Sequence, residues 1–119
     1  MKSVLIAPRK YVQGRGVLGE IGFYAALLGK KPAVLWDTVV RDLVGQAVSE
    51  SMRQAGLAAS EVEFGGESTR QEAARVAEIL QQQGADVCVG VGGGKTLDCA
   101  KAAAQQAGAK LLIAPTVAS

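Results

Sequence analysis

The residues with the clearest chemical potential form a glycine-rich turn between an apolar run and a helical pattern. Residues 87–91 lead into three glycines, a lysine, a hydroxyl and a carboxylate: Gly92, Gly93, Gly94, Lys95, Thr96 and Asp98. A strand that ends in glycines and opens a helix exposes backbone N–H groups at the positive end of the helix dipole. Glycines also let a ligand approach the backbone without a Cβ in the way. The spacing therefore predicts an anion site, with phosphate as the expected ligand.

Two common phosphate-binding motifs do not fit this turn. The P-loop, counted back from Gly94, needs a glycine where Val89 stands. The dinucleotide fingerprint, read from Gly90, needs a glycine at Lys95, and it belongs to the first strand–helix unit of a domain. A tight turn without a ligand is the alternative interpretation. Three glycines weaken strand and helix, however, so packing alone explains them poorly.

The charged candidates each have a functional and a structural interpretation. Asp37 follows the apolar residues 32–36, where it can accept from ribose hydroxyls or cap the next helix. Lys95 can approach a phosphate or stand in solvent, although the helix dipole disfavours a cation there. Asp98 suits the start of a helix on electrostatic grounds alone.

The hydroxyl candidates are less informative by themselves. Thr96 can bind a ligand or help to cap the helix that it opens. Thr116 lies beside Pro115 in the loop after the last apolar run, where it can contact a ligand or serve as an ordinary loop residue.

The elements that must position these residues alternate between strand and helix patterns. Strands are expected at residues 3–7, 32–36, 62–64, 86–90 and 110–114, with a short edge strand at 10–14. Helices are expected at 17–28, at 38–55, from a Ser68–Gln71 capping box to Gly84, and from the glycine turn to Gly108. Near-continuous apolar strands are typical of a parallel sheet that is covered on both faces. We therefore predict an α/β fold, a Rossmann-like three-layer parallel sheet with helices on both faces, in one domain at residues 1–119.

The carboxyl ends of such strands are where ligands bind in open α/β sheets. Asp37, the glycine turn and residues 115–119 are all expected at this edge. No helix follows the last strand, so we expect its second face to be uncovered and open to self-association.

Composition excludes several classes of function. The 119 residues are 49% hydrophobic, with a net charge of +2 and no basic cluster longer than two residues. Nucleic acid and anionic membranes are therefore not expected partners. The first apolar run is too short for a signal peptide, and no run reaches a membrane span, which predicts a cytoplasmic protein. The two cysteines are expected as buried thiols. Without histidine, no metal site is expected within this chain, and a Cys–His pair is excluded.

Several segments together resemble the glycerol dehydrogenases of the iron-containing alcohol dehydrogenase superfamily. The strongest likeness lies in residues 92–102 and 114–119, and residues 7–14 and 64–67 also fit. The resemblance implies an NAD-binding domain that lacks the family's helical C-terminal domain. Asp37 would contact the adenosine ribose, and the glycine turn would hold the pyrophosphate. The implied cofactor-binding residues are Asp37, Gly92, Gly93, Gly94, Lys95, Thr96, Asp98, Thr116 and Ser119.

The resemblance also implies a reaction, the NAD-dependent oxidation of glycerol, a small polyol, to dihydroxyacetone. Zinc would be held by the C-terminal domain of the full-length enzyme, a homo-oligomer, so no catalytic or metal residue is expected in this chain. The 119-residue chain is accordingly expected to be inactive alone. A dehydrogenase of another small polyol or hydroxy acid, and a truncated, non-catalytic nucleotide-binding module, are the alternatives.

Overall fold

A computed structural model describes residues 4–6 and 18–116. In this part of the chain strands and helices alternate throughout. The strands are β1 (Val4–Ile6), β2 (Pro32–Trp36), β3 (Ser60–Glu63), β4 (Val87–Gly92) and β5 (Lys110–Pro115), and the helices are α1 (Ile21–Leu28), α2 (Thr38–Gln54), α3 (Arg70–Gln83) and α4 (Gly94–Ala107). The predicted α/β class is confirmed. The edge strand expected at 10–14 falls outside the described residues.

The five strands form one parallel sheet in the order β1-β5-β4-β2-β3. The chain leaves β2 towards β3 at one edge and leaves β4 towards β5 in the opposite direction. Adjacent strands whose connections diverge in this way create a crevice at their carboxyl ends. The topology therefore places a ligand crevice between the ends of β2 and β4.

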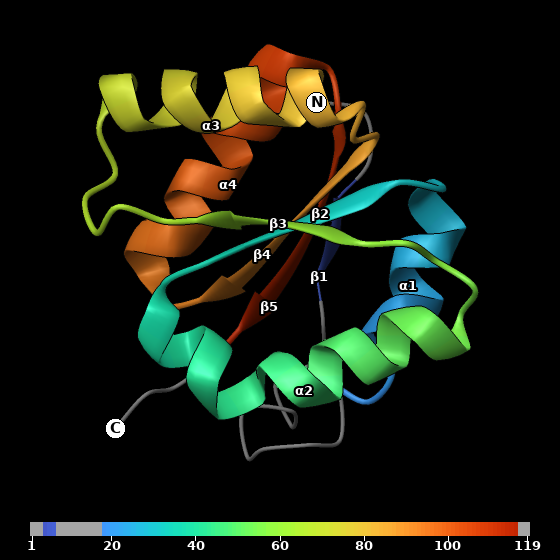
Figure 1. The fold of residues 1–119 in the computed structure, drawn as a ribbon. Coiled ribbons are helices and arrows are strands. Elements are labelled where there is room, and N and C mark those ends of the chain that lie inside the picture. The colour runs from blue at the N-terminus through green and yellow to red at the C-terminus, as the bar shows by residue number, and fades with distance from the viewer. Residues whose placement is uncertain (1–3, 7–17, 117–119) are drawn as a thin grey trace.

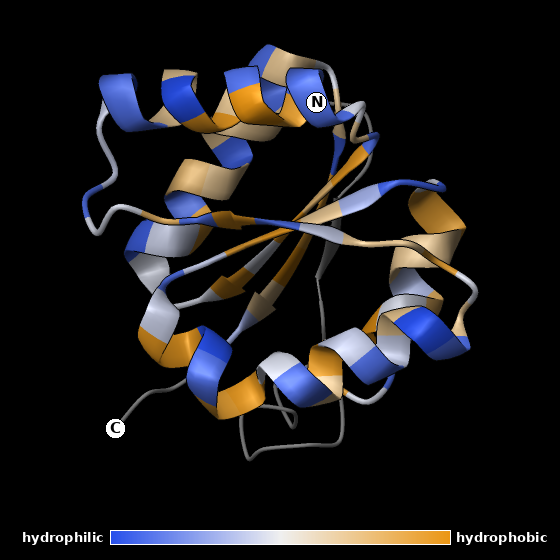
Figure 2. Cartoon of the chain, viewed as in Figure 1, coloured by the Kyte–Doolittle hydropathy of each residue, from blue (hydrophilic) through white to orange (hydrophobic). Residues whose placement is uncertain are grey.

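The sheet is the middle of three layers (Figure 1). Helices α1 and α2 cover one face, and α3 and α4 cover the other. Figure 2 shows apolar residues along the inner strands and polar residues on the outer sides of α2 and α3. Every residue of β2 and β4 is buried, which explains why their sequences are continuously apolar rather than alternating.

The last strand is not uncovered, contrary to expectation. It lies inside the sheet between β1 and β4, and its residues Leu111–Ala114 are buried. Leu112 and Ala114 belong to the core beneath α1 and α2, whereas Leu111 and Ile113 belong to the core beneath α3 and α4. The early helix α1 supplies the cover that a later helix was expected to provide.

Several element boundaries differ from the sequence prediction. Helix α1 begins at Ile21, after a turn at residues 18–20. Strand β4 continues to Gly92, which pairs with Pro115, so the first of the three glycines belongs to the strand. The helix cap is Thr69 and not Ser68, because the Thr69 hydroxyl accepts from the Glu72 N–H at 3.0 Å.

The amino ends of the central strands are tied together by one carboxylate. Asp86 precedes β4, and its two oxygens accept from the N–H groups of Lys30 (2.9 Å) and Lys31 (2.7 Å), just before β2. Its backbone N–H also donates to the Lys31 carbonyl at 3.0 Å. This end of the sheet is therefore closed by internal hydrogen bonds. No helix in the described part of the chain combines the length and the apolar character needed to cross a bilayer.

Candidate functional site

A cleft of about 350 Å³ lies at the carboxyl ends of the strands. It contains six of the nine residues that the sequence predicts for the cofactor site, together with three others. The lining residues are Asp37, Val40, Phe64, Gly66, Gly93, Gly94, Lys95, Thr96 and Thr116. They lie in the segments that directly follow β2, β3, β4 and β5, including the first turns of α2 and α4.

The glycine turn forms the floor of this cleft. An added Cβ on Gly93 or Gly94 meets no atom within 4 Å, and neither residue has a positive φ. Neither close packing nor backbone conformation thus requires glycine at these two positions. Side chains there would instead occupy the open space of the cleft. This is the arrangement expected where a ligand must approach the backbone.

Gly92 is a glycine for a different reason. Its φ is +151°, a value that L-residues rarely adopt, and an added Cβ would lie 3.1 Å from the Thr96 Oγ1. It is buried and does not line the cleft. Gly92 therefore shapes the turn, and the structure places Gly93 and Gly94 at its open surface.

Helix α4 has a bare N-terminus that faces the cleft. Asp37 caps α2 and Thr69 caps α3 through side-chain oxygens, but the cap position of α4 is Gly93, which has no side chain. The first backbone bond of α4 joins the Leu97 N–H to the Gly93 carbonyl at 3.0 Å. The N–H groups of the preceding helical residues 94–96 have no such helical partner, as is usual in a first turn. They give α4 the character of an anion site.

Asp37 satisfies the structural interpretation and still faces the cleft. Its Oδ1 accepts from the Val40 N–H at 2.8 Å and caps α2. The side chain is only partly buried, and the residue lines the cleft. A carboxylate has more acceptor positions than this one bond uses. Asp37 can therefore cap α2 and accept from a ligand hydroxyl at the same time.

Thr116, in the segment after β5, also lines the cleft and carries a buried hydroxyl. Its backbone N–H donates to the Gly92 carbonyl at 2.9 Å, which fixes it beside the glycine turn. Its Oγ1 is buried, and within the described residues it has no hydrogen-bond partner. An unpaired buried hydroxyl costs free energy, so it is a feature that calls for a ligand or a water.

Lys95 and Asp98 differ in their relation to the cleft. Lys95 lines it, and its Nζ contacts the Glu67 Oε2 at 3.0 Å. Asp98 is exposed on α4 and is not a lining residue. It also lies beyond the first turn of the helix, and the helix dipole favours an acidic residue most within that first turn. Ser119 lies outside the described residues.

Three lining residues are not predicted as site residues from the sequence. Val40 lies in the expected helix 38–55 and Phe64 in the expected strand 62–64, and the resemblance includes residues 64–67 without giving Phe64 or Gly66 a role. Val40 lines the cleft from the first turn of α2. Phe64 and Gly66 reach it because β3 pairs beside β2 and the Phe64 N–H donates to the Trp36 carbonyl at 2.8 Å. The available signal was the glycine pair at residues 65–66, which follows a strand as the glycine turn does.

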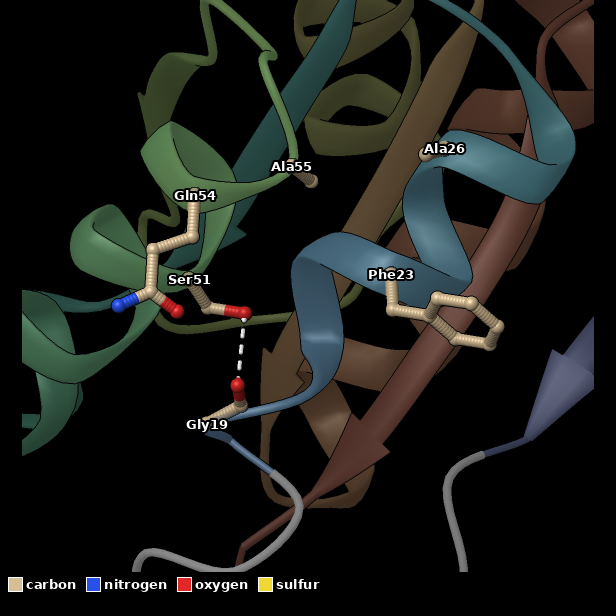
Figure 3. Close-up of a pocket in the computed structure, with 6 residues that line it drawn as sticks. All are labelled: Gly19, Phe23, Ala26, Ser51, Gln54 and Ala55. Carbon is tan, nitrogen blue, oxygen red and sulfur yellow. Dashed lines mark hydrogen bonds between the residues drawn. The ribbon is translucent and has the colours of Figure 1, made fainter.

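A second hollow lies between α1 and α2 and has a different character (Figure 3). Gly19, Phe23, Ala26, Ser51, Gln54 and Ala55 line it, with no charged residue among them. Its one buried hydroxyl, on Ser51, accepts from the Gly22 N–H at 2.8 Å and donates to the Gly19 carbonyl at 3.1 Å. The Ser51 hydroxyl thus joins the two helices, and the residues that line this hollow carry no charge.

Neither cysteine is suited to nucleophilic chemistry. Both are buried and free, as predicted. Burial raises the pKa of Cys88 to about 12 and that of Cys99 to about 11, so both remain neutral thiols at physiological pH. In the described ranges 4–6 and 18–116, no three His, Cys, Asp or Glu side chains gather into a metal-binding group. Asp37 is the one carboxylate among the described lining residues, which include no histidine or cysteine, so these residues do not supply a ligand set for a metal ion.

Fold and site together define a class of protein. A doubly wound parallel sheet with a bare helix N-terminus, a carboxylate and a hydroxyl around its crevice is a Rossmann-like α/β domain with a candidate ligand site at the carboxyl ends of its strands. The chain belongs to a particular family of this class, the one described as iron-containing alcohol dehydrogenase, which matches residues 8–119.

Named relatives agree with this family. The chain is 43% identical to a glycolaldehyde reductase of Halobacterium salinarum and 37% identical to a glycerol dehydrogenase of Escherichia coli, in both cases over its whole length. It covers 33% and 32% of those proteins, so it spans about a third of their length. The crystal structure of a probable glycerol dehydrogenase from Sinorhizobium meliloti superposes on 98% of the chain, with a TM-score of 0.75 and 35% identity, and the chain covers 29% of it.

Proposed function

We propose that this chain is the cofactor-binding part of an NAD-dependent dehydrogenase that oxidises glycerol to dihydroxyacetone. The observation that carries the proposal is the glycine turn, where two glycines without a packing role open the bare N-terminus of α4 to a cleft. The proposal also draws on the family and on relatives that are named glycerol dehydrogenases.

Each residue predicted for the cofactor site then has a role towards NAD. The N–H groups at Gly94 and Lys95 donate to the pyrophosphate, and the Lys95 ammonium offsets its charge. Asp37 accepts from the hydroxyls of the adenosine ribose. Thr116 pairs its buried hydroxyl with the cofactor. Gly92 and Thr96 hold the turn in shape, and Asp98 and Ser119 are proposed at the border of the site.

The bound nicotinamide would supply the hydride acceptor for the alcohol carbon. The protein's contribution from this chain is to bind the dinucleotide and fix its direction across the sheet edge. A metal ion, zinc by the resemblance, would have to be held by residues other than those of this cleft, and no step is assigned to it here.

NAD binding tests the proposal directly. Calorimetric titration of the purified chain with NAD is expected to show saturable binding at one site per chain. In Gly94→Ala the new methyl group enters the cleft and is expected to weaken NAD binding at least about ten-fold, a loss of about 1.4 kcal/mol. The fold has room for this methyl group. Its melting temperature is therefore expected to stay level or to rise, since alanine reduces the entropy of the unfolded chain.

The contrary outcomes are clear. A wild-type chain that binds no NAD would sink the proposal. If Gly94→Ala is as stable as wild type and binds NAD as tightly, the nucleotide does not bind at the glycine turn.

The relative at 43% identity favours a second candidate, the reduction of a small hydroxyaldehyde such as glycolaldehyde. Both reactions use the same cofactor half, so this cleft does not separate them. Assays of the full-length gene product with glycerol and NAD, and with glycolaldehyde and NADH, compare the two through kcat/KM.

A further inference from the structure

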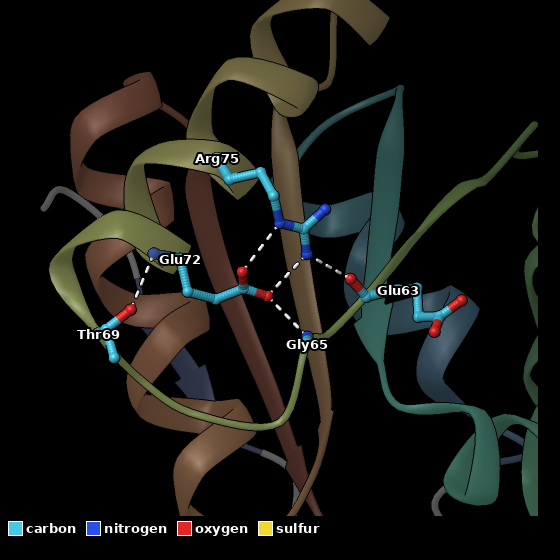
Figure 4. A network of polar contacts seen from close by, with 5 residues as sticks. All are labelled: Glu63, Gly65, Thr69, Glu72 and Arg75. Carbon is cyan, nitrogen blue, oxygen red and sulfur yellow. Dashed lines mark hydrogen bonds and ion pairs between the residues drawn. The ribbon is translucent and has the colours of Figure 1, made fainter.

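The loop between β3 and α3, residues 64–69, is fixed at its first half by an ion-paired network (Figure 4). The Glu72 carboxylate, 13% exposed, accepts from the Gly65 N–H at 2.6 Å and from two guanidinium nitrogens of Arg75 at 2.8 and 2.6 Å. The same Arg75 Nη2 donates to the Glu63 carbonyl at 2.7 Å. Helix α3 therefore holds the end of β3 and the start of the loop together.

The second half of the loop is held by the cap of α3. The Thr69 hydroxyl accepts from the Glu72 N–H at 3.0 Å, and the Thr69 N–H donates to the Glu67 carbonyl at 3.1 Å. Between these anchors Gly66 takes a φ of +107°, a left-handed value that turns the chain. The backbone on both sides of Glu67 is consequently constrained.

From this position the Glu67 side chain reaches Lys95. Its Oε2 lies 3.0 Å from the Lys95 Nζ, although 28 residues separate the two in the sequence. Gly66, next to Glu67, and Lys95 both line the cleft. The ion pair therefore joins the β3–α3 loop to the first turn of α4, across one side of the candidate phosphate site.

We propose that Glu67 is a negative determinant of affinity that competes with the bound pyrophosphate for Lys95. The inference rests on the proposed NAD site. An anion bound at the first turn of α4 is attracted by the Lys95 ammonium. The Glu67 carboxylate pairs with that ammonium and repels the anion. The pair is exposed, at 65% and 71%, so it is weak enough for a phosphate to displace. The pair accordingly lowers the affinity for the cofactor and speeds its release, and product release is the step that limits turnover in many enzymes.

The test compares Glu67→Gln with wild type and with Glu78→Gln. Glu78 is an exposed residue of α3 that does not line the cleft, so its substitution removes the same charge elsewhere. Calorimetry with NAD and with ADP, which both carry a pyrophosphate, is expected to give about two- to five-fold tighter binding in Glu67→Gln, the scale of one exposed ion pair. Adenosine, which has no phosphate, is expected to bind all three proteins alike. Raising the salt concentration is expected to shrink the gain for NAD.

The outcomes separate this inference from the site on which it rests. If wild type binds no NAD, both fall. If wild type binds NAD and Glu67→Gln binds it equally or more weakly, only the competition by Glu67 is overturned. A gain that also appears for adenosine, or in Glu78→Gln, would likewise overturn it, because the effect would then come from loop shape or from net charge.

Discussion

At the first turn of α4, Thr116 and the exposed backbone of Gly93 and Gly94 line the same cleft, and the Thr116 hydroxyl is buried. Each feature carries a cost in the empty protein. A buried hydroxyl without a partner loses its hydrogen bonds to water, and two glycines add freedom to the unfolded chain. Both costs have a common explanation if a polar ligand occupies the cleft.

Thr116→Val tests this explanation at a single atom. Valine keeps the shape of the side chain and removes only the unpaired Oγ1. Without ligand, we expect the free energy of unfolding to stay equal or to rise by up to about 1 kcal/mol, because no hydrogen bond within the described residues is lost. NAD binding is expected to weaken by about 1 kcal/mol, since the hydroxyl would pair with the cofactor.

Urea denaturation and calorimetry of the same preparation measure the two effects of Thr116→Val. A large loss of stability in this variant would show that the hydroxyl serves the fold instead of a ligand.

At the scale of elements, the contact between α4 and β4 depends on a third kind of glycine. A Cβ added to Gly90 would lie 2.7 Å from the Ala100 Cβ, closer than real side chains come. Gly90 therefore lets α4 pack directly against the centre of the sheet. Packing around α4 therefore requires glycine at Gly90 but not at Gly93 or Gly94.

Gly90→Ala is expected to destabilise the fold by about 1–3 kcal/mol, because α4 must move off β4 to make room. Gly94→Ala serves as the matched control with the same chemical change on the same strand–helix unit. Thermal or urea unfolding of both variants measures the contrast. Equal stability of the two would contradict the packing described here.

The network around Glu72 makes a second element-scale prediction. The hydrogen bonds from Arg75, together with that from Gly65, lower the pKa of Glu72 below its ordinary value of 4.5. At neutral pH the carboxylate is ionised in both states, and the stabilisation is complete. As pH falls below about 4.5 the unfolded chain takes up the proton first, so this stabilisation declines until pH has passed the lowered folded-state pKa.

Glu72→Gln is expected to lose about 1 kcal/mol of unfolding free energy at pH 7, and to lose less at pH 3 than at pH 7. Glu50→Gln is the control, because Glu50 and Arg53 form an equally spaced pair on α2 that is far more exposed. Its substitution is expected to change stability little. Urea denaturation at both pH values decides, and a pH-independent loss in Glu72→Gln would contradict an ionic role.

The sequence predicts the bounds of individual strands and helices better than it predicts which elements lie side by side in the fold. Apolar runs and helical periodicity locate β2 and α2 almost to the residue. The cap of α3 is misplaced by one position because Ser68–Gln71 and Thr69–Glu72 have the same spacing. The contact of Glu72 with Gly65, supported by the Arg75 side chain on the same helix, favours the second pair. The position of β5 inside the sheet depends on strand order, which leaves no local pattern.

The candidate site shows the same division. Asp37, the glycine turn and Thr116 could be predicted because each follows an apolar strand, and parallel strands share a carboxyl edge. Phe64 and Gly66 could not, since their place in the cleft depends on β3 pairing beside β2. Asp98 follows the glycine turn in sequence, yet the turn of the helix carries it outside the lining residues.

At the scale of the molecule, the cleft belongs to a domain that spans about a third of its named relatives. The sequence contains no histidine, and the resemblance assigns the metal ligands to the C-terminal domain. We therefore expect the 119-residue chain to bind NAD without oxidising glycerol, with or without added zinc. Absorbance of NADH at saturating glycerol measures this, and turnover by the purified chain would contradict it.

The two ends of the sheet differ in how easily they can accept new side chains. At the amino end, the Asp86 carboxylate satisfies Lys30 and Lys31, so a new side chain there must first replace existing hydrogen bonds. At the carboxyl end, a Cβ added at Gly93 or Gly94 meets no atom within 4 Å, so a new side chain there displaces nothing. Descendants of this chain could therefore acquire a different ligand preference by altering the loops at one end, while the other end preserves the ability to fold.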